Sequence, residues 1–364
     1  MLNQKNNEKK TIECNYNDNY SDRRNTYIDF VKYFTIFCVL WGHVIQQTCM
    51  LQNPNIDYIY RFIYTFHMPT FMSICGYYFA KSLNKYGLKK YVKIKLLYRL
   101  KSLIIPMLSF GAIKMVIFNK YDIIFYLQMV HDIWFLGSLV INTIVVLAVF
   151  HWCNGDFGHD IKFFIMVAPF ASIPKIEYGG QGLFMYLFFI IGFIFYNYFQ
   201  SKLLYLLKMR WLIFLSIFII TFIVFDNLPF EPSGIIFFKD ELLRSLIVFA
   251  LKIILGITGT YLIFLSLYKI FPYLKNNFIV KLSVKRGRYT LDIYLLQIII
   301  LEIIGGRIYR EILRLYEYNI IYQYGIIGEI IMTIVITSIF MEIVVFCGKV
   351  INRQRYMAKV FFYR

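Results

Sequence analysis

The chain has 364 residues, of which 59% are hydrophobic, and its mean hydropathy is +0.58. Soluble domains are usually about 45–50% apolar, so this composition indicates a membrane protein and argues against a chain of soluble domains. The net charge of +18 does not indicate nucleic-acid binding, because the basic residues gather in short segments between apolar runs. The six cysteines contain no C-x-x-C pair and the five histidines are dispersed, so we expect neither a metal site nor a disulfide framework.

The chain begins with a polar stretch rich in Asn and Lys, and we predict that residues 1–26 form a disordered cytoplasmic tail. This stretch lacks the apolar segment of a signal peptide. A membrane-spanning helix needs roughly 20 mostly apolar residues, and residues 27–350 contain about ten such segments. We therefore predict an all-α integral membrane domain over residues 27–350, followed by a basic cytoplasmic tail over residues 351–364. The expected spans are residues 27–50, 58–81, 100–118, 134–151, 161–175, 182–200, 209–226, 244–268, 288–305 and 325–348.

The distribution of positive charge predicts the orientation of these spans. Most of the 39 Lys and Arg residues fall in the termini and in alternate connecting segments, which the positive-inside rule assigns to the cytoplasm. We therefore expect a multi-pass protein of the inner membrane with both termini cytoplasmic. Lysines alternate with apolar residues over residues 85–96, a pattern typical of an amphipathic helix on the inner leaflet. This helix either binds anionic membrane lipids or forms a cationic entrance for a phosphorylated cofactor.

The first expected span carries three ionisable residues, Asp29, Lys32 and His43. Such residues are costly inside a membrane and indicate a cavity, a partner or a function. At about 100° per residue, the side chains of Lys32 and His43 differ by roughly 20° in direction around the helix axis. The side chain of Asp29 lies within about 40° of the direction of His43. His43 is roughly 24 Å from the cytoplasmic edge at 1.5 Å per residue, and an imidazole can act as a general base. The alternatives are a helix–helix hydrogen bond at His43 and an Asp29–Lys32 pair that reaches the inner interface.

The next three spans add further polar residues. His67 stands just before Pro69, which predicts a kink in the second span or a broken helix beside a cavity, and Gly76 permits close helix packing. Arg99 and Lys101 begin the third span, where they are most simply anchors at the inner interface. Trp134 begins the fourth span, where it is most simply an aromatic residue of the outer interface.

These segments together resemble acyltransferase family 3, whose members are integral membrane enzymes that O-acylate sugars and glycans. The resemblance covers residues 24 to 300 in the family's order. Each motif is weakly specific by itself, whereas the ordered set is fairly specific. One departure is Gln297, where family members often carry His, and we leave it outside the catalytic set. Lys32 and His43 match the basic residue and the His of the family's first motif. The next two matching elements are F-H-M-P-T-F of residues 66–71 with Gly76, and residues 99–106, which end in Pro106. The last two are W-F-L of residues 134–136 and G-R-Y-T-L-D-I-Y-L-L-Q of residues 287–297.

The resemblance implies transfer of an acyl group from acyl-CoA, usually acetyl-CoA, to a hydroxyl of a cell-surface polysaccharide or a lipid-linked glycan. The acyl group is acetyl or a larger group such as succinyl. His43 would act as the general base, and Lys32 would hold the donor or set the charge of the cavity. Arg99 and Lys101 would bind the phosphates of CoA. We expect supporting roles for Asp29, His67 and Trp134.

Two other classes of protein stay open from the residues alone. A transporter or flippase for glycan precursors could also have about ten spans and charges inside the membrane. Against it, the two halves of the chain show no visible repeat, and the polar residues concentrate in the first three spans. The third class is a structural or regulatory membrane protein in which His43 only packs against a neighbouring helix.

Overall fold

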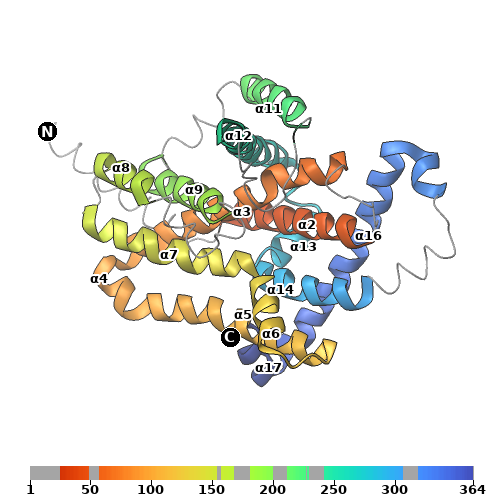
Figure 1. Ribbon diagram of the computed structural model, residues 1–364, viewed down its shortest axis with the longest axis horizontal. Helices are drawn as coiled ribbons and strands as arrows, with labels where there is room; N and C mark the ends of the chain where they lie inside the picture. The colour runs from red at the N-terminus through yellow and green to blue at the C-terminus, as the bar shows by residue number, and fades with distance from the viewer. Residues whose placement is uncertain are drawn as a thin grey trace, which may run out of the picture.

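The computed structural model describes residues 25–48, 57–153, 157–167, 181–199, 211–226, 228, 242–305 and 319–363. Every element of secondary structure among these residues is a helix, and most of the helices pack side by side in a bundle (Figure 1). The all-α prediction is therefore confirmed for the described part of the chain. Residues 1–24 of the predicted N-terminal tail lie outside it.

Each predicted span overlaps a helix of the structure. Among the described residues, five helical segments are long and apolar enough to cross a membrane, namely Thr26–Gln47, Leu88–Phe118, Trp134–Cys153, Leu243–Leu274 and Ile330–Arg353. The helices that match the predicted spans, in chain order, are α2 (Thr26–Thr48), α3 (Tyr58–Tyr86), α5 (Leu97–Phe118), α7 (Trp134–Cys153), α8 (Phe157–Val167), α9 (Gln181–Ile194), α11 (Trp211–Asp226), α12 (Leu242–Leu274), α14 (Thr290–Ile300) and α16 (Asn319–Arg353). Two of them continue as π-helical turns, α9 into η4 (Phe195–Phe199) and α14 into η6 (Leu301–Gly305). Shorter helices are α6 (Ile123–His131), α13 (Phe278–Arg286) and α17 (Arg355–Phe362).

The lysine-rich segment before the third span continues that span. Helix α4 (Leu88–Lys90) and the π-helical turn η2 (Tyr91–Leu96) run directly into α5, which makes one helical segment of 31 residues. At 1.5 Å per residue it is about 46 Å long, whereas the hydrocarbon core of a bilayer is about 30 Å thick. The segment is therefore longer than one perpendicular crossing needs, and exposed lysines lie in its first turns. The preceding break lies at Gly87, whose positive φ of 68° ends α3.

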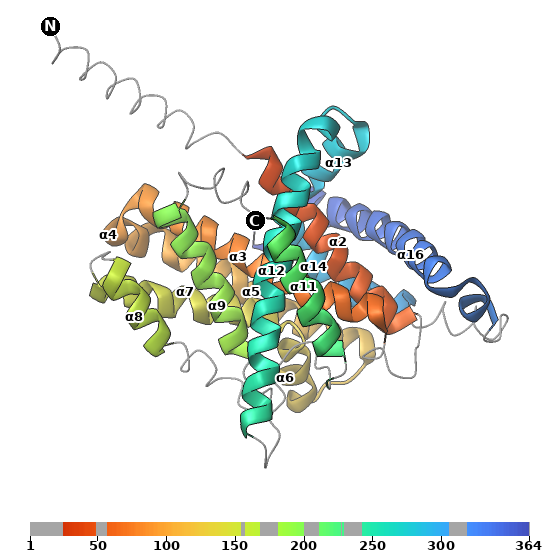
Figure 2. The ribbon, with the colours of Figure 1, turned by 90° about the horizontal axis from the view of Figure 1, so that it is seen from above.

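Helix α3 is the centre of the bundle and packs against α2, α9 and α12 (Figures 1 and 2). Its contact with α9 has no room for a side chain at two glycines. A Cβ atom on Gly76 would overlap the carbonyl oxygen of Phe189, and a Cβ atom on Gly192 would overlap the carbonyl oxygen of Ser73. The close packing predicted for Gly76 is therefore confirmed, and it brings the two backbones into direct contact.

Replacing Gly76 with alanine is expected to lower the free energy of unfolding by about 1–3 kcal/mol, because α3 and α9 must move apart. Gly137→Ala is the matched control, since the atom nearest to a Cβ added at that position is the Met107 sulfur at 4.0 Å. The measurement is thermal unfolding of the detergent-solubilised protein. Equal melting temperatures for Gly76→Ala and Gly137→Ala would contradict this account of the interface.

Arg61 lies in the first turns of α3 and is buried. Its guanidinium forms an ion pair with Asp226 at 2.8 Å and donates hydrogen bonds to the carbonyl oxygens of Phe225 and Asp226. Carbonyl groups at a helix C-terminus lack partners within their own helix. Arg61 therefore caps α11 and stabilises the position of α11 against α3.

Residues 351–364, expected to be a basic tail, contain helix α17. Ala358 and Phe362 are buried, and the Phe361 ring lies 5.5 Å from the Phe110 ring of α5. Apolar residues spaced three and four apart fall on one side of a helix, which explains why this segment folds back onto α5. Figure 1 shows α17 beside α5 near the C-terminus, in agreement with the contact between these two helices.

Candidate active site

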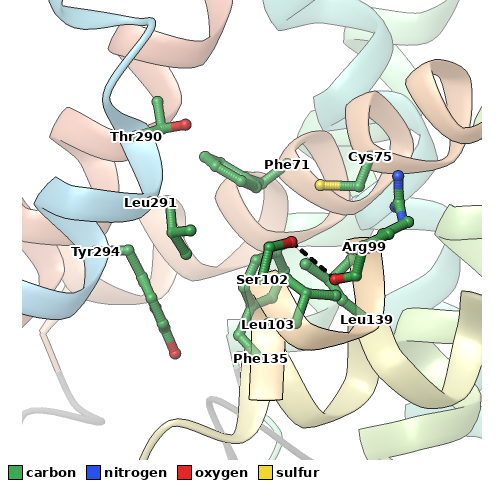
Figure 3. Close-up of a pocket in the computed structure, with 10 residues that line it drawn as sticks. All are labelled: Phe71, Cys75, Arg99, Ser102, Leu103, Phe135, Leu139, Thr290, Leu291 and Tyr294. Carbon is green, nitrogen blue, oxygen red and sulfur yellow. Dashed lines mark hydrogen bonds between the residues drawn. The ribbon is translucent and has the colours of Figure 1, made fainter. Parts of the chain in front are cut away.

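Helices α3, α5, α7 and α14 line a partly open cavity of about 220 Å³ (Figure 3). Its wall is mostly apolar, with a guanidinium, two hydroxyl groups, a phenol and a thiol among the lining side chains. Such a mixture of apolar walls and few polar groups is typical of sites for small molecules. The lining residues are Phe71, Cys75, Arg99, Ser102, Leu103, Phe135, Leu139, Thr290, Leu291 and Tyr294.

Arg99 is the cation of this cavity. Its guanidinium lies 5.2 Å from the centroid of the Phe79 ring, its Nε atom donates a hydrogen bond to Thr143 Oγ1 at 3.3 Å, and it hydrogen-bonds with the Tyr91 side chain. These contacts hold the charged group in a defined position at the wall. Lys101, two residues further along α5, is exposed and does not line the cavity. The structure therefore brings Arg99 to the cavity and leaves Lys101 on the surface.

Lys32 lies next to the cavity on α2. Its Nζ atom is 3.1 Å from Asp29 Oδ1 and 4.6 Å from the centroid of the Tyr78 ring, and it interacts electrostatically with the cavity residue Cys75. Asp29 is buried, whereas Lys32 is partly exposed. The Asp29–Lys32 pair considered from the sequence is therefore formed, and Lys32 faces α3.

His43 and His67 lie close together at the other end of the same contact between α2 and α3. His43 is partly buried, hydrogen-bonds with the side chain of Gln46 and interacts electrostatically with His67. The buried His67 places Nδ1 2.7 Å from the carbonyl oxygen of Ile63, and its ring lies 4.5 Å from that of Tyr64. A carbonyl oxygen only accepts, so Nδ1 carries the proton and Nε2 of neutral His67 is left as an acceptor.

The histidine pair lies beyond the end of the cavity. His67, Phe71 and Cys75 are spaced four residues apart and share one face of α3, and the last two line the cavity. His67 is therefore one turn, about 6 Å, beyond the cavity wall. Along α2, His43 is eleven residues from Lys32, or roughly 16 Å. Lys32 lies over the Tyr78 ring of α3, and His43 interacts electrostatically with His67 of the same helix, in agreement with the common face that their spacing predicted.

The structure also reveals a charged cluster that the sequence did not predict. Lys114 of α5 is buried, and its Nζ atom lies 3.0 Å from Asp132 Oδ2 and 2.8 Å from Glu302 Oε2. A lysine inside an apolar span was a signal that a carboxylate partner exists, since an unpaired buried charge is very costly. The sequence did not identify the partners, because Glu302 lies far along the chain from Lys114.

Trp134, two residues after Asp132, packs against the cavity residue Phe135 with ring centroids 6.1 Å apart.

Within the described residues, no three His, Cys, Asp or Glu side chains are grouped as a metal site would require. The polar groups at the cavity are instead a fixed cation and hydrogen-bonding groups. They suit an anionic or carbonyl-containing organic ligand.

For the part of the chain that the structure describes, the fold and the site together define an all-helical membrane protein with a cation at a partly open cavity and two histidines beyond the cavity. A family model described as an acyltransferase domain matches residues 25–347, and the chain therefore belongs to acyltransferase family 3. The chain is also similar to nodulation protein NolL of Sinorhizobium fredii (strain NBRC 101917 / NGR234). The two are 26% identical over 191 residues, which cover 48% of this chain and 50% of the relative. The chain thus spans about half the length of this curated relative. No solved structure matches the chain.

Proposed function

We propose that this protein is a membrane O-acyltransferase that transfers an acetyl group from acetyl-CoA to a hydroxyl of a cell-surface polysaccharide or a lipid-linked glycan. The observation that carries the proposal is a cavity lined by the Arg99 guanidinium, with the His43–His67 pair beyond one end of it. This arrangement would provide an anion-binding group for the donor and a basic group for the acceptor. Membership of an acyltransferase family supports the reaction class.

The size of the cavity determines which part of the donor it can take. Its volume of about 220 Å³ is below the roughly 300–1,000 Å³ of pockets for drug-sized ligands. The acyl thioester end of CoA would therefore enter, while the nucleotide and its phosphates stay outside. Arg99 offers a forked set of N–H donors that suits an anion or a carbonyl oxygen at the entrance. Lys101, exposed two residues further along α5, adds positive charge to the surface that the nucleotide approaches.

In the proposed reaction, His43 takes the proton from the acceptor hydroxyl as its oxygen attacks the thioester carbonyl carbon. The carbon–sulfur bond then breaks, CoA leaves as a thiolate, and the ester of the acceptor remains. The proton held by His43 returns to the thiolate through solvent. General base catalysis of this kind contributes about 10²–10⁴-fold to a rate. His67 supports His43 from α3, and the buried Asp29 holds Lys32 next to the cavity.

The charge bias of the connecting segments supports a multi-pass arrangement of about ten spans in the inner membrane with both termini cytoplasmic. In this orientation Arg99 is near the cytoplasmic side, and His43 is roughly 24 Å from the cytoplasmic edge. The donor then enters from the cytoplasm, and acylation takes place near the outer leaflet, where lipid-linked or exported glycans are found.

The proposal is tested with the purified protein in lipid nanodiscs, acetyl-CoA labelled in the acetyl group, and a lipid-linked oligosaccharide acceptor. We expect release of the CoA thiol together with label in the acceptor, and both should depend on the acceptor and the protein. Movement of the glycan across a vesicle membrane without thiol release would overturn the proposal in favour of a transporter.

Replacing Arg99 with glutamine is expected to raise the KM for acetyl-CoA about 10- to 100-fold, because hydrogen bonds to charged groups contribute about 1.5–3 kcal/mol. The change should be smaller for Lys101→Gln, since that side chain does not line the cavity. Lys285→Gln, which removes an exposed cation of α13, is the control for general loss of positive charge. An unchanged KM in Arg99→Gln would contradict its role in donor binding.

A further inference from the structure

Gln297 of α14 is completely buried, yet its side-chain amide has no hydrogen-bond partner in the part of the chain that the structure describes. Its exposed fraction is 0%, and both Nε2 and Oε1 lack partners there. Buried polar groups in native proteins are nearly always paired, because an unpaired amide is unfavourable in a medium of low polarity. The amide therefore has two hydrogen-bonding groups that a bound molecule could satisfy.

The position of Gln297 relates it directly to the cavity. Thr290, Leu291 and Tyr294 form the α14 part of the cavity wall (Figure 3). Gln297 is three residues beyond Tyr294, about 4.5 Å further along the axis, and lies within roughly 20° of the direction of Thr290. The amide thus extends the polar side of α14 past the end of the cavity.

This extension leads toward the histidine pair. The backbone of Asp29 on α2 packs directly against Gly287, just before α14, and α13, α14 and η6 contact α2 in succession. Helices α2 and α14 therefore run in the same direction from that contact. Gln297 is ten residues beyond Gly287, and His43 is fourteen beyond Asp29. Measured along the helix axes from the Asp29–Gly287 contact, the amide consequently lies about one turn, roughly 6 Å, short of His43.

We propose that Gln297 donates a hydrogen bond from Nε2 to the carbonyl oxygen of the acyl donor. This inference rests on the proposed acyl transfer. When the acceptor oxygen attacks the carbonyl carbon, the electron pair of the C=O bond moves onto the carbonyl oxygen, and the amide N–H stabilises the resulting negative charge. The charge returns to the carbonyl as the CoA thiolate leaves. A primary amide is neither protonated nor deprotonated to a useful extent at neutral pH, so Gln297 acts by hydrogen bonding while His43 moves the proton.

The test separates this role from a structural one, because the two predict opposite changes in stability. Gln297→Leu removes the unpaired amide with little change in volume, so the melting temperature should stay the same or rise. The kcat for transfer should fall about 100-fold, as when one donor to a developing oxyanion is removed. The dissociation constant for free CoA, which lacks the acyl group, should change less than twofold. Gln297→His, which keeps an N–H donor, should retain more activity than Gln297→Leu, and Gln128→Leu at an exposed position is the matched control.

Wild-type kcat in Gln297→Leu would overturn the inference, and the amide would then be satisfied by a buried water. A parallel fall of kcat, melting temperature and CoA affinity would also overturn it, since that pattern indicates a packing role. The proposed function fails separately, if the wild-type protein shows no acceptor-dependent thiol release. Loss of transfer in His43→Ala together with full activity in Gln297→Leu would leave the proposed function standing and remove only the role of Gln297.

Discussion

Replacement of His43 with alanine is expected to reduce acyl transfer by about 10²–10⁴-fold, the range that a general base contributes. Binding of acetyl-CoA should change little, because Lys32, which lies beside the cavity residue Cys75, is roughly 16 Å from His43 along α2. The effect should therefore appear in kcat and not in the affinity for the donor. Transfer of labelled acetyl groups and equilibrium binding of CoA measure the two quantities separately.

The controls for this experiment are other histidines of the chain. His151→Ala changes an exposed side chain of α7 and should behave as the wild type. His67→Gln should lose less activity than His43→Ala, because His67 supports the base without receiving the proton itself. A well-folded His43→Ala protein with wild-type activity would rule out the assigned role of His43.

Replacement of Lys114 with methionine is expected to lower the free energy of unfolding by about 3 kcal/mol, because Asp132 and Glu302 lose their cation. This value is at the low end for broken buried ion pairs, since the side chains of Asp132 and Glu302 are 44% and 34% exposed. The cluster joins α5, the start of α7 and the π-helical turn η6. Its loss should therefore loosen three elements around the cavity. Unfolding in mixed micelles with increasing denaturant measures the change.

A double variant separates charge from packing in this cluster. Lys114→Met combined with Glu302→Gln removes one cation and one anion together and should recover most of the lost stability. If the single Lys114→Met variant is as stable as the wild type, the cluster makes no net contribution and this explanation is wrong.

Some features of the site could be predicted because they depend on local periodicity. The spacing of Lys32 and His43 implied a common helical face, and both residues indeed interact with side chains of α3. The apolar segments predicted the helices, and the small residue at position 76 predicted close packing, which Gly192 completes from α9. These properties follow from 3.6 residues per turn and from the size of one side chain.

Other features required the tertiary structure. Arg99 and Lys101 are two residues apart and looked equivalent, yet only Arg99 lines the cavity, because successive helical residues point in different directions. One of the two partners of Lys114 is Glu302, which lies on another helix and leaves no local pattern in the sequence. In the sequence, Gln297 was likewise only a difference from the family motif, which often has His at this position, and it was not a candidate site residue.

By itself, the sequence determined the all-helical membrane architecture, the face of the first span and the family to which the chain belongs. Hydropathy and helical periodicity are properties of neighbouring residues, so they are readable without the fold. The tertiary structure decided which polar groups share a cavity, which charges pair and which buried amide lacks a partner. These depend on contacts between helices that are far apart in the chain, and such contacts exist only once the bundle has packed.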